Sequence, residues 1–165
     1  MVQFVKGNLL ESNCDYICHQ VNCQGKMNSG IAKQIREKWP IVYKNYIEKY
    51  NILNGVSGAL LGDIQIVGLW EDYYATDFHQ SVINMFSQEH YGYDGRRYTS
   101  YDAFWNCLNL IKRTVPKGKT IGFPKKIGCD RGGANWPVIL EMITEVLGVE
   151  YKVFIYYLEG DDGTY

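Results

Sequence analysis

Short runs of β-branched and aromatic residues alternate with helical patterns along most of this 165-residue chain. Such alternation favours a sheet covered by helices on both faces. We therefore predict an α/β fold, a three-layer α/β/α sandwich with a mixed central sheet. The expected strands are Val2–Lys6, Tyr16–Val21, Ile64–Val67, Ser81–Phe86, Thr120–Phe123 and Lys152–Leu158.

Four helices are predicted from apolar spacing and from residues that favour helix ends. Ser29 can cap the first helix, and Pro40 stands where the second can begin. Thr99 or Ser100 starts the third helix, and Asn135 caps the last. The pattern predicts a single domain over residues 1–158, followed by an acidic tail over residues 159–165.

The charge balance limits the partners that the chain can attract. Lysine and arginine number 17 against 18 acidic residues, so the formal net charge is −1. General nucleic-acid and membrane-surface binders depend on a strong positive field, which argues against both classes. No apolar run reaches the length of a membrane span, and the first ten residues lack the apolar core of a signal peptide. We expect a cytoplasmic monomer with no nucleic-acid or membrane partner.

Five cysteines are present, an odd number with irregular spacing that suits reduced thiols. Cys14, Cys18, His19 and Cys23 lie close enough in the sequence to raise the alternative of a zinc site. No pair has the short spacing of common zinc motifs, and adjacent residues of a strand point to opposite faces. The sequence therefore predicts neither a metal site nor a cofactor.

Two glycine-rich corners each follow an expected strand and lead into a helix, over residues 22–30 and 128–136. Glycine lets the backbone turn tightly and approach a ligand, and the helix start offers unpaired N–H groups. Both corners lie beyond the carboxyl ends of strands, where open α/β sheets bind ligands. A matched pair of anion sites suggests a diphosphate. The alternative is that the glycines only permit sharp turns.

Other nucleotide motifs are missing, because neither GxxxxGK[ST] nor a GxGxxG following a strand occurs. This disfavours P-loop nucleotidases and dinucleotide dehydrogenases. A third corner carries Arg96 and Arg97, which can clamp a phosphate or simply belong to a solvated turn.

Three segments together resemble a macro domain, the ADP-ribose-binding fold: KGNLLE, HQVNCQGKMNSGIA and KIGCDRGGANW. The resemblance covers nearly the whole chain. Within the family, the chain is similar to the branch that contains the yeast ADP-ribose 1″-phosphatase and the terminal ADP-ribose protein glycohydrolase. It implies that Asn22 binds the distal ribose and that Asn8 replaces an aspartate that accepts a hydrogen bond from adenine. The implied ligand-binding residues are Asn8, Leu9, Asn22, Gly25, Ser29, Gly30, Ile31, Gly128, Cys129, Asp130, Arg131, Gly132 and Gly133.

The resemblance also identifies departures that bear on chemistry. Gln88 stands where the glycohydrolase branch has a lysine, and Gly132 stands where it has an aspartate. A covalent lysine mechanism is therefore not expected. His19, Asp130 and Asn22 remain as catalytic candidates, with the first two moving protons. The alternatives are a half-buried structural histidine and a turn aspartate.

These sequence features and the resemblance leave three classes of function. The first is a hydrolase that acts at the distal ribose of an ADP-ribose derivative, either a 1″-phosphate or an ester-linked ADP-ribosyl group. The second is a non-catalytic module that binds ADP-ribose. The third, nucleic-acid binding, depends only on Arg96, Arg97 and tyrosines that can stack on bases.

Overall fold

The computed structural model describes residues 1–54, 56, 58–69 and 79–160. These residues form a six-stranded sheet in the order β1–β6–β5–β2–β4–β3. Neighbouring strands are parallel except for β3 and β4, which run antiparallel, so the predicted mixed sheet is confirmed. The strands are β1 (Val2–Lys6), β2 (Tyr16–Asn22), β3 (Ile64–Gly68), β4 (Ser81–Gln88), β5 (Thr120–Pro124) and β6 (Lys152–Tyr157).

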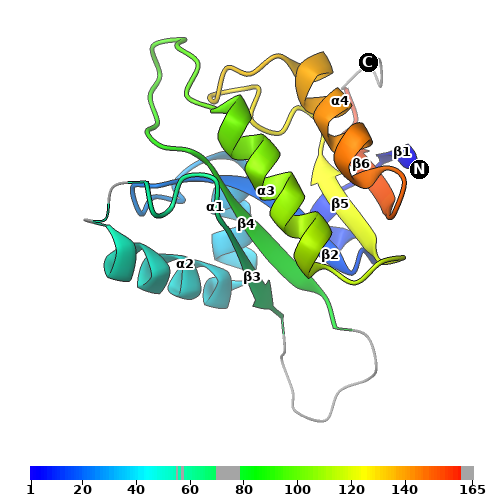
Figure 1. Ribbon diagram of the computed structural model, residues 1–165, viewed down its shortest axis with the longest axis horizontal. Coiled ribbons are helices and arrows are strands. Elements are labelled where there is room, and N and C mark those ends of the chain that lie inside the picture. The colour runs from blue at the N-terminus through cyan, green and yellow to red at the C-terminus, as the bar shows by residue number, and fades with distance from the viewer. Residues whose placement is uncertain (55, 57, 70–78, 161–165) are drawn as a thin grey trace.

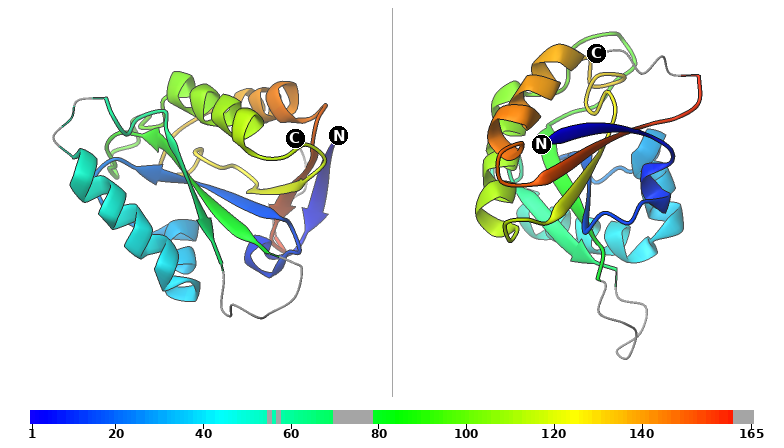
Figure 2. Two further views of the ribbon diagram at one scale, coloured as in Figure 1. Left: turned by 60° about the horizontal axis from the view of Figure 1, so that its bottom comes forward. Right: turned by 90° about the vertical axis from the view of Figure 1, so that its right-hand side faces the viewer.

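Helices cover both faces of this sheet, which confirms the three-layer prediction (Figures 1 and 2). A short 3-10 helix, η1 (Leu9–Glu11), follows β1. On one face lie α1 (Gly30–Lys38) and α2 (Pro40–Leu53), and on the other α3 (Tyr101–Thr114) and α4 (Trp136–Leu147). None of the helices in the described segments has the length and apolar character needed to cross a bilayer.

The two faces of the sheet carry separate apolar clusters. Ile17 and Val21 of β2 pack under α1 and α2, whereas Cys18 packs on the opposite side, under α3 and α4. This alternation follows from the two-residue period of a strand. Full burial of a large apolar side chain contributes roughly 1.5–3 kcal/mol to folding, so both layers hold the sheet firmly.

Five strand ends differ from the sequence prediction. β3 and β5 each extend one residue further than expected, to Gly68 and Pro124. β2 extends one residue further, to Asn22, and β4 extends two further, through Ser87 and Gln88. Both added residues of β4 are polar but buried, because Gln20 of β2 bonds to their side chains. β6 ends at Tyr157, one residue earlier than expected.

The tail expected over residues 159–165 is described only at its start. The carboxylate of Glu159 lies 2.8 Å from the ammonium of Lys6, and both side chains are well exposed. Residues 161–165 lie outside the described part of the chain. An exposed pair of this kind adds little to stability.

Helix caps match the prediction in position but differ in their bonding. The Ser100 hydroxyl accepts a hydrogen bond from the backbone N–H of Ala103 at 3.2 Å, and the Asn135 side chain accepts one from Val138. Ser29 precedes α1 without any side-chain capping bond. Two serines in equivalent positions therefore contribute differently to helix stability.

We expect Ser100→Ala to lower the free energy of unfolding by about 1 kcal/mol, because a cap hydrogen bond is lost. Ser29→Ala is the matched control and should leave the value unchanged within a few tenths of a kcal/mol. Urea denaturation of the two variants tests this, and equal losses would contradict the difference in capping.

His19 lies in the centre of the sheet within a buried polar chain. Its Nε2 is 2.5 Å from the Asn84 side-chain oxygen, and the Asn84 amide donates to Gln65. Gln65 in turn donates to the Asn45 carbonyl in α2. Burial lowers the pKa of His19 from 6.5 to about 4, against the opposing effect of its bond to Asn84. The imidazole is therefore neutral near pH 7.

This depressed pKa predicts a loss of stability in acid. As the pH falls below about 6.5, His19 is protonated in the unfolded chain but stays neutral in the folded one. The contribution of His19 to the free energy of unfolding is therefore fully present above that pH and is lost as the pH falls toward 4. His19→Gln should remove this contribution. Between pH 7 and 4.5 the wild type should lose about 2–3 kcal/mol more unfolding free energy than the variant. Unfolding free energies are measured by urea denaturation at each pH. If they fall equally with pH in the wild type and in His19→Gln, the burial argument is contradicted.

Candidate functional site

A cleft of about 400 Å³ opens at the carboxyl ends of β2, β4 and β5. Three chain segments form it: the corner between β2 and α1, the end of β4 with the loop that follows it, and the corner between β5 and α4. The lining residues are 20–22, 26–32, 88, 91, 93, 124–128 and 130–132. The structure thus brings the two glycine-rich corners together at one site.

Eight of the residues proposed from the sequence line this cleft. They are Asn22, Ser29, Gly30, Ile31, Gly128, Asp130, Arg131 and Gly132. The first four come from the β2–α1 corner and the others from the β5–α4 corner. The N-terminus of α1 also opens here, and its first N–H groups have no partner within the helix.

Asn8 and Leu9 do not line the cleft. The Asn8 side-chain oxygen caps η1 by accepting from the Leu10 backbone N–H at 3.0 Å. Leu9 is buried, and its side chain lies close against Gly122 of β5. The acceptor expected for adenine is therefore already bonded within its own loop.

Gly25, Cys129 and Gly133 are also not among the residues that line the cleft. Gly25 has a φ of +71° and sits against the Tyr50 ring. The Cys129 side chain packs against the core, and Gly133 lies close to the Arg96 carbonyl. These residues shape the corners without lining the cleft.

The placement of His19 does not agree with its expected role in catalysis. The side chain is fully buried and does not line the cleft. It shares the α1–α2 side of the sheet with Ile17 and Val21, where it bonds to Asn84. This placement agrees with the structural interpretation of His19, because a buried side chain outside the cleft lining makes no contact with the cleft.

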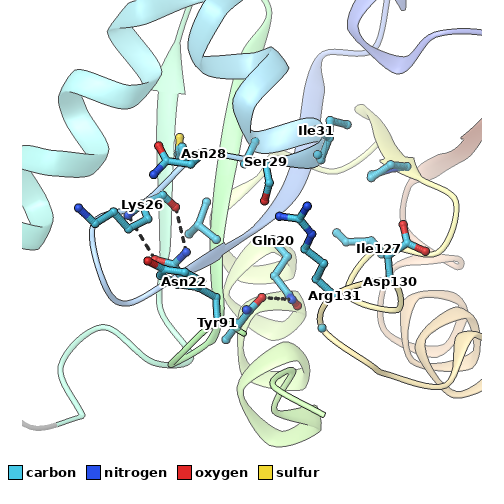
Figure 3. A pocket seen from close by; sticks show the side chains of 18 of the residues that line it. Gln20, Asn22, Lys26, Asn28, Ser29, Ile31, Tyr91, Ile127, Asp130 and Arg131 are labelled. Carbon is cyan, nitrogen blue, oxygen red and sulfur yellow. Dashed lines mark hydrogen bonds between the residues drawn. The ribbon is translucent and has the colours of Figure 1, made fainter. Parts of the chain in front are cut away.

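Asn22 lines the cleft but its side chain also braces the β2–α1 corner. Its oxygen accepts from the Gln24 N–H at 3.0 Å and from the Tyr46 hydroxyl at 2.9 Å. Its amide donates to the Lys26 carbonyl at 2.9 Å (Figure 3). An amide carries two hydrogens, so one donor remains for a ligand.

Asp130 and Arg131 point in different directions from their shared loop. In Figure 3 the Arg131 guanidinium is turned toward Ser29, whereas the Asp130 carboxylate lies on the side away from Asn22. Arg131 also stacks on the Tyr93 ring at 4.5 Å and donates to its hydroxyl at 3.1 Å. Asn22 and Asp130 thus occupy opposite parts of the cleft.

Several cleft residues were not predicted from the sequence. They include three cations and two aromatic residues, Lys26, Lys125, Lys126, Tyr91 and Tyr93. Lysine and tyrosine are common on protein surfaces, so the residue type alone did not indicate a ligand-binding role. Position did offer one, because Lys125 and Lys126 directly follow β5 and Lys26 lies inside a glycine-rich corner.

Gly132 fits its position only because it has no side chain. A Cβ atom there would overlap the Thr99 hydroxyl and the Gly128 carbonyl oxygen. The Gly132 carbonyl accepts from the Tyr98 and Thr99 backbone N–H groups at 2.8 and 2.9 Å. These bonds join the β4–α3 loop to the β5–α4 corner, so an aspartate at this position would require both loops to move.

Thiol chemistry finds no support at the site. Burial and the nearby Asp130 charge raise the pKa of Cys129 to about 11, and burial with Glu89 raises the pKa of Cys23 to about 12. Both thiols are protonated near pH 7 and are poor nucleophiles. Across the described segments, no three His, Cys, Asp or Glu side chains come together as a metal site.

We expect Cys23 and Cys129 to react slowly with iodoacetamide at pH 7.5, because almost none of either thiol is ionised. The rate should rise as the pH approaches 10, and it should become rapid at pH 8.5 once urea unfolds the chain and restores ordinary pKa values. Mass spectrometry of the alkylated peptides measures both conditions. Fast labelling of the folded protein at pH 7.5 would contradict the raised pKa values.

Comparison with known proteins identifies the fold. No family model matches the chain. A curated relative, the DNA ADP-ribosyl glycohydrolase of Thermus aquaticus, is 25% identical over 159 residues, which are 93% of this chain and 41% of the relative. The chain thus spans about two fifths of that protein's length.

Solved structures extend the comparison. The macrodomain of Thermus aquaticus DarG superposes with a TM-score of 0.72 at 23% identity, covering 95% of this chain and 98% of that one. Thermosipho africanus DarTG in complex with ADP-ribose gives a TM-score of 0.74 at 19% identity, covering 97% of this chain and 42% of that one. The chain therefore has the macrodomain fold.

Proposed function

We propose that the chain binds ADP-ribose in this cleft and hydrolyses a bond at the distal ribose. One observation carries the proposal: two glycine-rich corners, the start of α1 and several cationic side chains converge on a single 400 Å³ cleft. Backbone N–H groups and a helix N-terminus favour an anion such as a diphosphate. The solved complex of Thermosipho africanus DarTG with ADP-ribose supports the choice of ligand.

In this proposal the diphosphate lies between the two corners. Gly30 and Ile31 contribute from the α1 side, and Gly128 and Gly132 from the other side. The distal ribose lies near Asn22. Because the Asn8 oxygen is bonded to Leu10, we expect weaker selection for adenine than a charged aspartate would give.

The substrate class rests on the relatives. The name of the curated relative refers to ADP-ribosyl groups on DNA, which gives no support to the earlier exclusion of nucleic acid. We therefore include ADP-ribosylated DNA with ADP-ribose 1″-phosphate and ester-linked ADP-ribosyl groups as candidate substrates. Near-neutral charge still favours recognition of the ADP-ribosyl group over the DNA backbone.

In this proposal hydrolysis at the distal ribose proceeds without a covalent enzyme intermediate, because Gln88, which by the resemblance stands in place of the lysine of the glycohydrolase branch, has no nucleophilic amine. A water oxygen forms a bond to C1″, and the bond from C1″ to the leaving group breaks. The water proton passes to a base while the leaving group takes up a proton from solvent or an acid. Asp130 is the candidate base, and it would have to turn toward Asn22 to act.

A specific observation also favours the second candidate, a module that binds ADP-ribose without turnover. By the resemblance, Gln88 and Gly132 stand where the glycohydrolase branch has a lysine and an aspartate. In addition, the Asp130 carboxylate lies away from Asn22 in Figure 3. Such a module would bind ADP-ribose and leave every candidate substrate intact.

Calorimetry with ADP-ribose tests binding. Ile31→Glu places a negative charge at the start of α1 inside the cleft, so we expect at least tenfold weaker binding. Ile52→Glu is the matched control, because Ile52 lies in α2, is 77% exposed and does not line the cleft. Equal affinities for both variants would place the ligand elsewhere.

Turnover distinguishes the two candidates. The wild type and Asp130→Asn should be incubated with each of the three candidate substrates, and free ADP-ribose measured. Hydrolysis that falls at least tenfold in Asp130→Asn supports an enzyme with Asp130 as base. Tight binding with no product from any substrate would support the non-catalytic module instead.

A further inference from the structure

We infer that Gln88 is held with its amide nitrogen toward the cleft, as a hydrogen-bond donor that selects ligands with an acceptor oxygen beside Asn22. This inference rests on the proposed function and adds a specificity-determining residue to it. Gln88 lines the cleft and is 8% exposed. A chain of four hydrogen bonds on the cleft floor fixes which end of its amide faces the ligand.

The chain begins at a backbone carbonyl, which can only accept. The Thr99 hydroxyl lies 2.8 Å from the Gly128 carbonyl oxygen and 3.3 Å from the Gln20 side-chain oxygen, and it donates its single hydrogen to the nearer carbonyl. The Thr99 oxygen can then only accept from other neighbours. The Gln20 side-chain atom 2.9 Å away must therefore be the amide nitrogen.

The orientation of Gln20 follows from that bond. Its other terminal atom is the oxygen, which accepts from the buried Ser87 hydroxyl at 2.8 Å. The amide nitrogen of Gln20 has a second hydrogen, directed at a Gln88 side-chain atom 2.8 Å away. That atom must accept, so it is the Gln88 oxygen.

The Gln88 nitrogen is then the polar end left for the cleft. In the part of the chain that the structure describes, no group is found to accept a hydrogen bond from it. A reversed amide would set two N–H donors against each other at 2.8 Å, and an unmade buried bond costs about 1–3 kcal/mol. This chain of hydrogen bonds through Thr99, Gln20 and Gln88, called the relay below, thus holds Gln88 as a donor before any ligand arrives.

The position of Gln88 in the sheet indicates which part of the ligand it contacts. β2 and β4 pair so that Asn22 lies directly opposite Gln88 in the sheet. Asn22 also keeps one amide hydrogen for a ligand. Two neutral amides therefore offer donors at the same end of the cleft, next to the proposed distal ribose. They favour a ribose hydroxyl, carbonyl or phosphoryl oxygen there.

Gln88→Glu tests this directly, because it exchanges the cleft-facing nitrogen for an oxygen of the same shape. Gln20 can still donate to the other carboxylate oxygen, so the relay remains bonded. We expect ADP-ribose affinity in calorimetry to fall at least tenfold, since an acceptor with negative charge would face acceptor oxygens. Gln3→Glu, an exposed position on β1, is the control for charge and should leave affinity unchanged.

Gln88→Met separates the lost donor from the added charge. It removes the hydrogen bond without introducing charge, so we expect a two- to tenfold loss of affinity. Wild-type affinity in both Gln88→Glu and Gln88→Met would overturn the inference while leaving the proposed function intact. Failure of the wild type to bind ADP-ribose would overturn the proposed function and the inference together.

Thr99 tests the relay as a positioning device. Thr99→Val removes the hydroxyl that orients Gln20, and it should weaken ADP-ribose binding about as much as Gln88→Met. Thr99→Ser retains the hydroxyl and should restore binding to within about twofold of the wild type. If Thr99→Ser binds as poorly as Thr99→Val, the hydroxyl does not act through Gln88. If Thr99→Val fails to fold, the two Gln88 variants still decide the result.

Discussion

The hydrogen bonds between the β4–α3 loop and the β5–α4 corner hold the cleft together. Gly132 accepts two backbone N–H groups from residues 98 and 99, and the Thr99 hydroxyl donates to Gly128. Through Gln20, the same hydroxyl reaches the end of β2. Three segments that are distant in the sequence are thereby fixed relative to one another. The absence of a side chain at Gly132 is what allows this close approach.

The site also shows how a chain with no overall positive charge can present a surface suited to an anion. The formal net charge is −1, yet three lysines and an arginine line one cleft, where a helix N-terminus also opens. A local arrangement of donors acts over a few ångströms, whereas long-range attraction to a polyanion depends on the summed field and is screened by salt. The cleft therefore suits a small charged group better than an extended one.

Periodicity in the sequence predicted the architecture well, because apolar spacing reports directly which face of a strand or helix is buried. It located all six described strands to within two residues at either end, and the capping positions of α3 and α4. It failed at the carboxyl end of β4, where Ser87 and Gln88 are polar. Their burial depends on bonds to Gln20, which lies 67 and 68 positions earlier. Spacing within one strand cannot reveal a partner in another.

The candidate site was predicted in part for the same reason. Glycine-rich corners are local features, so the segments around residues 22–31 and 128–132 were found. The sequence did not show that His19 is a buried residue rather than a cleft residue, because a motif does not indicate which face of the sheet a residue occupies. The alternation of β2 places His19 on the same face as Ile17 and Val21, where it is fully buried and does not line the cleft. Tyr93 and the lysines are brought in by loops whose course the sequence does not encode in any short pattern.

The contact between Arg131 and Tyr93 lies at the rim of the cleft, where the tyrosine is 74% exposed. Stacking of a guanidinium on an exposed ring contributes about 0.5–1 kcal/mol. Stacking alone therefore lowers the population of the separated arrangement by less than tenfold, since a tenfold change needs about 1.4 kcal/mol, and the bond to the Tyr93 hydroxyl adds to this. The rim thus depends on one contact between exposed side chains, whereas Thr99, Gln20 and Gln88 on the floor are joined by a chain of hydrogen bonds.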